Sequence, residues 1–180
     1  MCQDWVLEEK QVILRLEKVT EQHAAILYQY ISNPRMYEYL EEQIPTQAEV
    51  QHNFRFAALE KSPDNETMIW LKWAAVNPQN QYVGLVEIGI FDDLYAEIGF
   101  MTFVDFQRQG YATLYCLEAI AQTQKRFSLP SLHASVNEYN IASRKVLEKL
   151  GFKLQKVNKN AELIKGKPTD ELIYCLNFSV

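Results

Sequence analysis

The stretch that decides the fold runs from residue 94 to residue 127 and begins Leu94-Tyr95-Ala96-Glu97-Ile98-Gly99-Phe100-Met101-Thr102-Phe103-Val104-Asp105-Phe106-Gln107-Arg108-Gln109-Gly110-Tyr111-Ala112-Thr113. Residues 95–104 are rich in aromatic and β-branched side chains, which predicts a strand. Apolar residues then recur at helical spacing as far as Phe127, which predicts a helix. Gly110 permits a tight turn between the two. The first turn of the helix presents amide N–H groups without intrahelical partners, which favours an anion such as phosphate.

The residues around this turn exclude two common nucleotide-binding motifs. No Gly-Lys-Ser/Thr follows the turn, as it does in the phosphate loop of nucleotide hydrolases, and the G-x-G-x-x-G of dinucleotide-binding proteins is absent. Taken alone, the hexapeptide from Gln107 to Ala112 is equally compatible with a plain strand-to-helix turn that needs one glycine. The rest of the chain is needed to decide between an anion site and a simple turn.

The composition is that of one globular domain, which we expect to span residues 1–180, with 48% hydrophobic and 23% charged residues. A net charge of −5 argues against a dedicated nucleic-acid binder and is compatible with a cationic substrate, or with solubility alone. The cysteines, Cys2, Cys116 and Cys175, are too far apart for a disulfide framework or a zinc site. Without a visible signal peptide or a bilayer-spanning apolar run, we expect a soluble, cytoplasmic protein with neither nucleic acid nor membrane as partner.

The remaining periodicities predict the elements on either side of residues 94–127. Before it we expect a strand at 12–19, helices at 21–32 and 47–61 with Thr20 and Thr46 as N-caps, and strands at 67–76 and 82–91. After it we expect a strand at 132–137, a helix at 139–150 that Gly151 ends, and strands at 152–157 and 171–178 separated by a polar loop at 158–170.

The order of these elements predicts the topology of the sheet. Three strands in succession, 67–76, 82–91 and 95–104, form an antiparallel meander, whereas the helical crossover that follows makes 95–104 and 132–137 parallel neighbours. We therefore predict an α/β (α+β) fold with a mixed, mostly antiparallel sheet of about six to seven strands flanked by about four helices. A ligand is expected beside the parallel pair, where the strand pattern changes.

A second informative segment spans residues 136–152, Val136-Asn137-Glu138-Tyr139-Asn140-Ile141-Ala142-Ser143-Arg144-Lys145-Val146-Leu147-Glu148-Lys149-Leu150-Gly151-Phe152. By itself it is an amphipathic helix with a glycine stop. Its Asn-x-x-Ser followed by Leu-Gly-Phe, placed after Gln-x-x-Gly-x-Ala in the right order, resembles the GNAT superfamily of N-acetyltransferases over about residues 10–178. The ending Val-Leu-Glu-Lys-Leu-Gly-Phe is most similar to the ribosomal-protein N-terminal (RimJ/RimL-like) acetyltransferases.

The resemblance implies the GNAT fold, with a splayed parallel strand pair, and acetyl-coenzyme A as co-substrate, with no metal. The coenzyme would lie in the gap between strands 95–104 and 132–137. Main-chain groups of Phe100, Met101 and Thr102 would pair with its pantetheine arm, and Asn140 and Ser143 would contact it. Its pyrophosphate would bind the turn that starts at Gln107, through the amides of Arg108, Gln109, Gly110, Tyr111, Ala112 and Thr113.

For acetyl transfer to an amine, a base must take a proton from the amine and an acid must supply one to the leaving thiolate. Glu97 is the first choice for the base, because it lies mid-strand where the histone-acetylating branch of the family carries its glutamate. Glu87 on the neighbouring strand competes with it, and His133 is a further alternative. Many family members use a tyrosine as the acid, but Leu147 stands at that position here. Ser143, Tyr139 and Ser135 are the candidates that replace it.

The resemblance places the amine acceptor against residues 36–44 and the hairpin tryptophans Trp70 and Trp73. The acidic and aromatic side chains of this segment could receive a cationic amine or form a solvated acidic loop; they are Tyr37, Glu38, Tyr39, Glu41 and Glu42. The function expected is transfer of the acetyl group to a primary amine, a protein N-terminus or a small molecule, by direct attack in a ternary complex. The alternative is a non-catalytic coenzyme A binding or interaction module. Monomer and homodimer both stay open.

Overall fold

The structure is a computed structural model and describes residues 14–64, 67–91 and 94–178. The N-terminal residues considered for a signal peptide, and residues 12–13 of the first predicted strand, lie outside the described residues. No helix within the described ranges has both the length and the apolar character needed to cross a membrane.

The described chain forms a seven-stranded sheet and four α-helices, which confirms the predicted fold class. The strands are β1 (Arg15–Lys18), β2 (Ile69–Val76), β3 (Tyr82–Ile90), β4 (Ala96–Thr102), β5 (Ser131–Asn137), β6 (Lys153–Ile164) and β7 (Lys167–Asn177). The helices are α1 (Glu21–Ile31), α2 (Gln47–Ala58), α3 (Tyr111–Phe127) and α4 (Ile141–Lys149), with short 3₁₀ turns η1 (Pro34–Tyr37) and η2 (Val104–Phe106).

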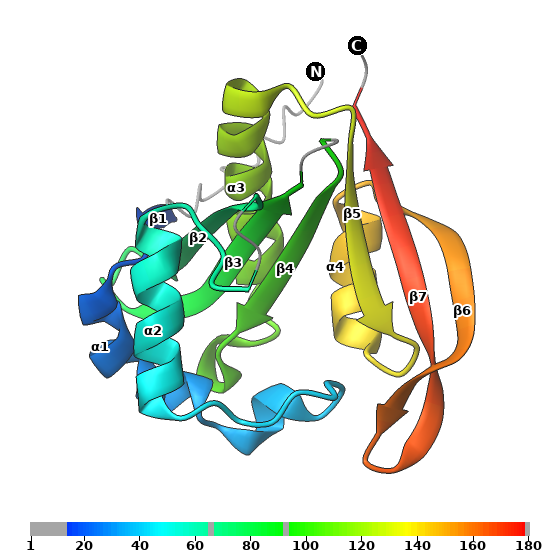
Figure 1. The fold of residues 1–180 in the computed structure, drawn as a ribbon, viewed down its shortest axis with the longest axis horizontal. Helices are drawn as coiled ribbons and strands as arrows, with labels where there is room; N and C mark the ends of the chain where they lie inside the picture. The colour runs from blue at the N-terminus through cyan, green and yellow to red at the C-terminus, as the bar shows by residue number, and fades with distance from the viewer. Residues whose placement is uncertain (1–13, 65–66, 92–93, 179–180) are drawn as a thin grey trace, which may run out of the picture.

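The strand order is β1-β2-β3-β4-β5-β7-β6, and every pair is antiparallel except β4 and β5. The parallel pair follows from the α3 crossover, because a helix must carry the chain back before it can form a strand in the same direction. Figure 1 shows β4 and β5 close together at their start and diverging toward their carboxyl ends. The sheet is thereby split into two halves that meet at this pair.

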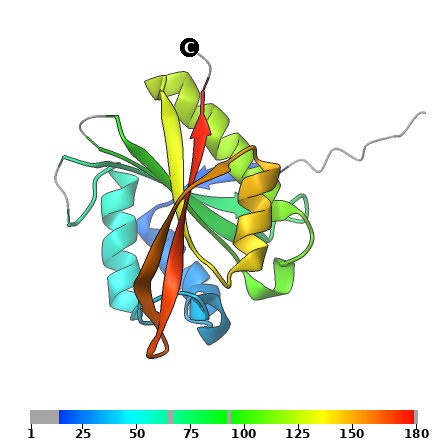
Figure 2. The same cartoon turned by 90° about the vertical axis from the view of Figure 1, so that its right-hand side faces the viewer.

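Helices cover the two faces of the sheet. Ala24, Leu27 and Phe54 of α1 and α2 pack with Ala74 and Leu85 on one face. On the other face, the apolar stripe of α3 and the inner side of α4 form the larger cluster; it includes Tyr115, Cys116, Ala119, Leu147 and Ile88. Figure 2 shows the two pairs of helices on opposite sides of the strands. Cys116 is buried in this core.

The C-terminal part of the fold differs from the prediction. The segment 158–170, expected as a polar loop, belongs to a long hairpin in which β6 pairs with β7 from Lys153 opposite Cys175 to Ile164 opposite Lys167. Lys165 and Gly166 turn the chain at φ values of 50° and 76°, the left-handed conformation that two-residue hairpin turns need. Because β6 is an edge strand with most side chains in solvent, it does not need the apolar alternation on which the prediction relied.

Candidate active site

A cavity of about 400 Å³ fills the gap between β4 and β5. The two strands pair only at Glu97 and His133, and beyond this point they separate. Gly99, Phe100 and Met101 line one side of the gap, and residues 134–137 line the other. The open notch therefore lies where the sequence predicts it, beside the parallel pair and toward the carboxyl ends of its strands.

The residues predicted to bind the coenzyme fall into two groups. Phe100, Met101, Asn140 and Ser143 line the cavity, whereas Thr102 ends β4 and its hydroxyl lies 2.6 Å from that of buried Tyr115. The second group lies outside the described cavity lining. It comprises the exposed turn between η2 and α3, Gln107, Arg108, Gln109 and Gly110, and the first residues of α3, half-buried Tyr111 and Ala112 and buried Thr113.

The turn before α3 leaves the helix without a capping side chain. In α2 and α4 the N-cap side chains, Thr46 and Asn140, accept from the amides of Glu49 and Ser143 at 3.3 and 3.1 Å. The N-cap of α3 is Gly110, at φ 82°, and its first turn carries no acidic residue. Its amides stay available to an anion, at the positive end of the helix dipole.

Two glutamine side chains hold this turn against the segment that precedes it. Gln107 Nε2 donates to the Thr102 carbonyl at 3.1 Å, and Gln109 Nε2 donates to the Asp105 carbonyl at 3.1 Å. Arg108 between them adopts a φ of 61°, which is uncommon for a residue with a side chain. The Gln107 contact links the predicted pyrophosphate turn to the end of β4, and the Gln109 contact links it to η2.

The two candidate bases lie in different surroundings. Glu87 lines the cavity; its carboxylate accepts from Lys72 Nζ and reaches across β4 above Gly99. Glu97 is exposed, accepts from the Tyr95 hydroxyl at 2.6 Å and is not among the described residues that line the cavity. The difference arises from register: Glu97 lies where β4 and β5 are still paired, and Glu87 lies opposite Gly99, where they have separated.

His133 belongs to a separate polar cluster at the paired end of β4 and β5. Its ring stacks on Tyr95 at 4.6 Å, and its Nε2 lies 3.2 Å from Ser131 Oγ and 4.0 Å from Cys175 Sγ. Burial raises the pKa of the Cys175 thiol, and burial together with the Glu97 carboxylate raises the pKa of Tyr95. Within the described residues, no three or more His, Cys, Asp and Glu side chains are grouped to hold a metal ion.

The structure also distinguishes among the candidates for the general acid. Ser143 and Ser135 line the cavity, but Ser135 Oγ donates to Glu171 Oε1 at 2.5 Å. Tyr139 is 59% exposed and is not in the described lining. Leu147 lies at the cavity wall and is 1% exposed, so it offers an apolar surface where the family's tyrosine would stand.

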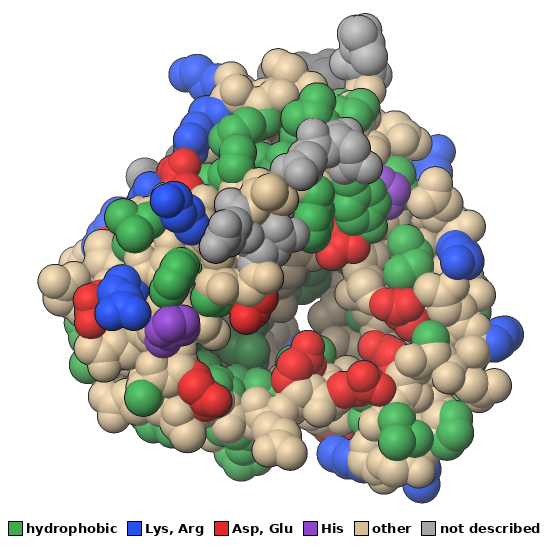
Figure 3. Space-filling model, viewed as in Figure 1, with side chains coloured by type: hydrophobic (Ala, Val, Ile, Leu, Met, Phe, Trp, Pro, Cys, Tyr) green, Lys and Arg blue, Asp and Glu red, His purple; other side chains and the backbone are tan. Residues whose placement is uncertain are grey.

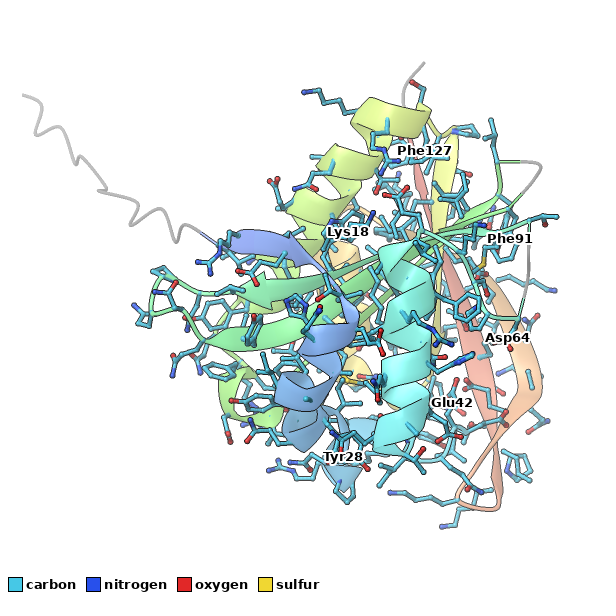
Figure 4. All side chains as sticks on the ribbon, turned by 60° about the vertical axis from the view of Figure 1, so that its left-hand side comes forward. Lys18, Tyr28, Glu42, Asp64, Phe91 and Phe127 are labelled. Carbon is cyan, nitrogen blue, oxygen red and sulfur yellow. The ribbon has the colours of Figure 1, made fainter. Side chains whose placement is uncertain are left out.

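One end of the cavity is acidic. Tyr39 and Leu40, with Glu41 and Glu42, line it from the segment before α2, and Glu162 lines it from β6. Figure 3 shows acidic side chains gathered around the opening, and Figure 4 shows Glu42 on the segment that leads into α2. Of the predicted acceptor residues, Tyr37, Glu38, Trp70 and Trp73 are not among the described lining residues.

Contacts between distant segments form the wall at this acidic end. The Glu41 carboxylate accepts from the main-chain amide of Leu163, and Asn137 Nδ2 donates to Glu162 Oε2 at 2.6 Å. Burial, and the carboxylates of Glu171, Glu41 and Glu42, raise the pKa of Glu162. The β6–β7 hairpin therefore forms part of the wall.

Two residues of the site were missed by reasoning from the sequence alone. Lys72 interrupts the otherwise apolar stretch 68–76, and a charge within a buried strand is a signal that could have drawn attention to it. Glu162 gave no such signal, because it lies among polar residues that resemble a loop.

The model of the acetyltransferase (GNAT) domain family matches residues 14–153. A search of proteins with curated functions found no match.

Solved structures match over nearly the whole chain. An acetyltransferase from Salmonella typhimurium that modifies the N-terminal serine of ribosomal protein L7/L12 is 21% identical, with a TM-score of 0.78 over 94% of this chain and 97% of that one. RimL, a ribosomal L7/L12 α-N-protein acetyltransferase in complex with coenzyme A, is 20% identical, with a TM-score of 0.80 over 93% and 95%. The spermidine N-acetyltransferase from Vibrio cholerae, in complex with coenzyme A and spermine, is 17% identical, with a TM-score of 0.77 over 91% and 95%. At these identities the likeness establishes a shared fold.

Proposed function

Because the chain belongs to the GNAT family of acetyltransferases, we propose that it transfers the acetyl group of acetyl-coenzyme A to a primary amine by direct attack in a ternary complex. A single domain over residues 1–180 and a cytoplasmic site of action are part of this proposal, the latter supported by the free thiols of Cys116 and Cys175. The observation that carries the proposal is the notch between β4 and β5, which lies next to a helix start without a capping side chain.

The residues around the notch suit each part of the coenzyme. The uncapped first turn of α3, with Gly110 before it, supplies main-chain donors for a pyrophosphate. The main chain of Phe100 and Met101 faces the gap without a partner strand there, so an extended pantetheine arm can pair with it. Asn140 and Ser143 lie on the opposite wall. Related structures that contain coenzyme A support this assignment.

We assign the base to Glu87 rather than Glu97, because Glu87 is the carboxylate of the two that reaches the cavity. The substrate ammonium gives one proton to Glu87, directly or through water, and the free amine then attacks the acetyl carbonyl carbon. A C–N bond forms, the C–S bond breaks and the sulfur leaves with its electron pair. The nitrogen gives its second proton to solvent as the amide forms. We assign Ser143 to relay a proton to the sulfur and to regain one from solvent, because Ser135 already donates to Glu171 and Tyr139 lies outside the described lining.

A second candidate, a coenzyme A binding module without catalysis, is favoured by one observation, the buried Leu147 in place of a tyrosine. Two measurements separate the candidates. Calorimetry with coenzyme A reports binding, and thiol release from acetyl-coenzyme A with a panel of peptides, amino acids, polyamines and drug-like amines reports transfer. Binding without amine-dependent thiol release would favour the module, and absence of both would refute the acetyltransferase proposal.

The Gly110→Ala exchange is expected to weaken coenzyme A binding about tenfold. A residue with a Cβ is strained by about 1–2 kcal/mol in the left-handed conformation, and the turn must keep that conformation to present its amides. A Cβ at this position would meet no atom within 4 Å, so crowding is not the cause. Calorimetry with coenzyme A measures the effect.

Gly166→Ala is the matched control, because Gly166 has a similar φ of 76° and equally open space in the β6–β7 turn, away from the coenzyme site. Gly166→Ala should lower the stability of the protein without weakening coenzyme A binding. Equal affinities for the wild-type protein and Gly110→Ala would place the pyrophosphate elsewhere.

Replacing Glu41 and Glu42 together by glutamine is expected to raise the KM of a cationic amine about fivefold, with an unchanged KM for acetyl-coenzyme A. Each exposed carboxylate contributes about 0.5 kcal/mol of attraction, and salt screens it, so the difference should shrink at high ionic strength. Glutamine keeps a carbonyl that can accept from Leu163, which preserves the contact with β6. Glu118→Gln, on the exposed face of α3, is the control. An unaltered amine KM would show that this acidic segment is only solvated.

A further inference from the structure

A row of three residues crosses the sheet and ends at the cavity. Lys72 of β2 lies directly opposite Glu87 of β3, and Glu87 lies directly opposite Gly99 of β4. Residues opposite one another in neighbouring strands point to the same face of a sheet, so these side chains share one surface. Lys72 and Glu87 form an ion pair on it, and the next position, Gly99, has no side chain.

The ammonium group of Lys72 is enclosed on several sides. Nζ lies 4.8 Å from the centre of the Trp70 ring and 5.6 Å from the centre of the Phe54 ring, in addition to its contact with Glu87 Oε2. Phe54 is a buried core residue of α2, and the Lys72 side chain is only 15% exposed. Two rings that attract the cation and a carboxylate that accepts from it leave the ammonium little freedom to move.

The absence of a side chain at residue 99 decides where the Glu87 carboxylate can lie. A Cβ on Gly99 would come within 3.2 Å of Glu87 Oε1 and 3.3 Å of its Cγ. The carboxylate therefore occupies the space above β4 that a side chain would otherwise take, and it lies at the edge of the gap between β4 and β5. Its two oxygens have different surroundings: Oε2 faces Lys72, and Oε1 lies above Gly99.

We propose that Lys72 is a positioning residue, whose ammonium, seated between Trp70 and Phe54, holds Oε2 of Glu87 so that Oε1 is presented above Gly99 to the reacting amine. The inference rests on the proposed function, because it needs Glu87 as the base. Lys72 does not touch the reacting atoms in this arrangement. It restricts a flexible carboxylate to one orientation, which matters because displacement of a reacting group by about 1 Å can lower the rate about a hundredfold.

The test compares Lys72→Met with the wild-type protein in the thiol-release assay. We expect kcat to fall at least about tenfold, while the KM and Kd of acetyl-coenzyme A change less than about twofold, since the coenzyme residues are untouched. Lys72→Arg, which keeps a cation for Glu87, should recover part of the lost kcat. Lys18→Met is the matched control, because Lys18 also pairs with a glutamate, Glu60, but is not among the described residues that line the cavity. It lies opposite Trp73, so its side chain is on the other face of the sheet from Lys72. Lys18→Met should leave kcat as it is.

A double-mutant cycle distinguishes positioning from a general effect on the fold. If Lys72 acts through Glu87, Lys72→Met should lower kcat less than about twofold in a Glu87→Gln background. Two outcomes would overturn the inference and leave the acetyltransferase function intact. The first is that Lys72→Met lowers kcat as much in the Glu87→Gln background as in the wild-type protein. The second is that Lys72→Met alone has a normal kcat although Glu87→Gln is inactive. No amine-dependent thiol release by the wild-type protein would instead refute the proposed function. If Lys72→Met does not fold, Lys72→Gln, a neutral donor of similar length, takes its place under the same criteria.

Discussion

Glu87→Gln is expected to lower kcat at least about a hundredfold and to leave coenzyme A binding unchanged. The exchange removes the group that takes the proton from the amine, a contribution that typically lies between a hundredfold and ten-thousandfold. It keeps the size of the side chain and an amide oxygen that can still accept from Lys72. Thiol release at saturating acetyl-coenzyme A measures the loss, and calorimetry with coenzyme A shows whether the notch is intact.

The same exchange at Glu97 compares the two candidate bases directly. We expect Glu97→Gln to retain the larger part of the turnover, because the Glu97 carboxylate is exposed and accepts a hydrogen bond from the Tyr95 hydroxyl. Collapse of turnover in Glu97→Gln, with activity kept in Glu87→Gln, would reverse the assignment. In that case the first choice from the sequence would be right, and the role of Lys72 proposed above would fail with Glu87.

Gly84→Ala is expected to lower the free energy of unfolding by about 1–3 kcal/mol, the usual effect of overpacking, and the melting temperature by several degrees. A Cβ on Gly84 would lie 2.5 Å from the main-chain oxygen of Met101 and 3.0 Å from the Tyr115 ring. Both neighbours are fixed, the first by strand pairing and the second by complete burial. The close contacts of the added Cβ can therefore be relieved only if β3 and β4 move apart. Thermal and denaturant unfolding measure the change.

Gly89→Ala in the same strand is the matched control. Its Cβ would approach the Met68 side chain, with sulfur at 3.1 Å, and a flexible methionine can move aside. We expect a clearly smaller loss of stability than for Gly84→Ala. Equal losses in the two variants would show that the close approach of β3 to β4 does not govern the effect.

Patterns that are local in the chain were predicted well from the sequence. Thr46 before α2 and Gly110 before α3 mark helix starts, as predicted, and both act within a few residues of the chain. The parallel pair followed from the strand–helix–strand order around 95–137. The ends of the elements were predicted less accurately. Helix α2 ends at Ala58 rather than at residue 61, because the chain leaves the helical conformation after Ala58, on its way to β2.

The acidic end of the cavity could not be predicted in the same way. Glu41 and Glu162 are far apart in the chain, and their approach depends on the contact of Glu41 with the main chain of Leu163. A hairpin edge strand with solvent on both sides has no periodicity that separates it from a loop. Its contribution to the wall therefore became visible only in the fold.

The sequence by itself determined the order of the elements, the glycine turn before α3 and membership of a family whose motifs are short and continuous. These features depend on backbone preferences and periodicities within about a dozen residues. Only the tertiary structure decided which carboxylate meets the cavity. That choice depends on the register that sets Lys72, Glu87 and Gly99 side by side, and on the point at which β4 and β5 part. Register and separation result from packing between segments distant in the chain, and no local pattern encodes them.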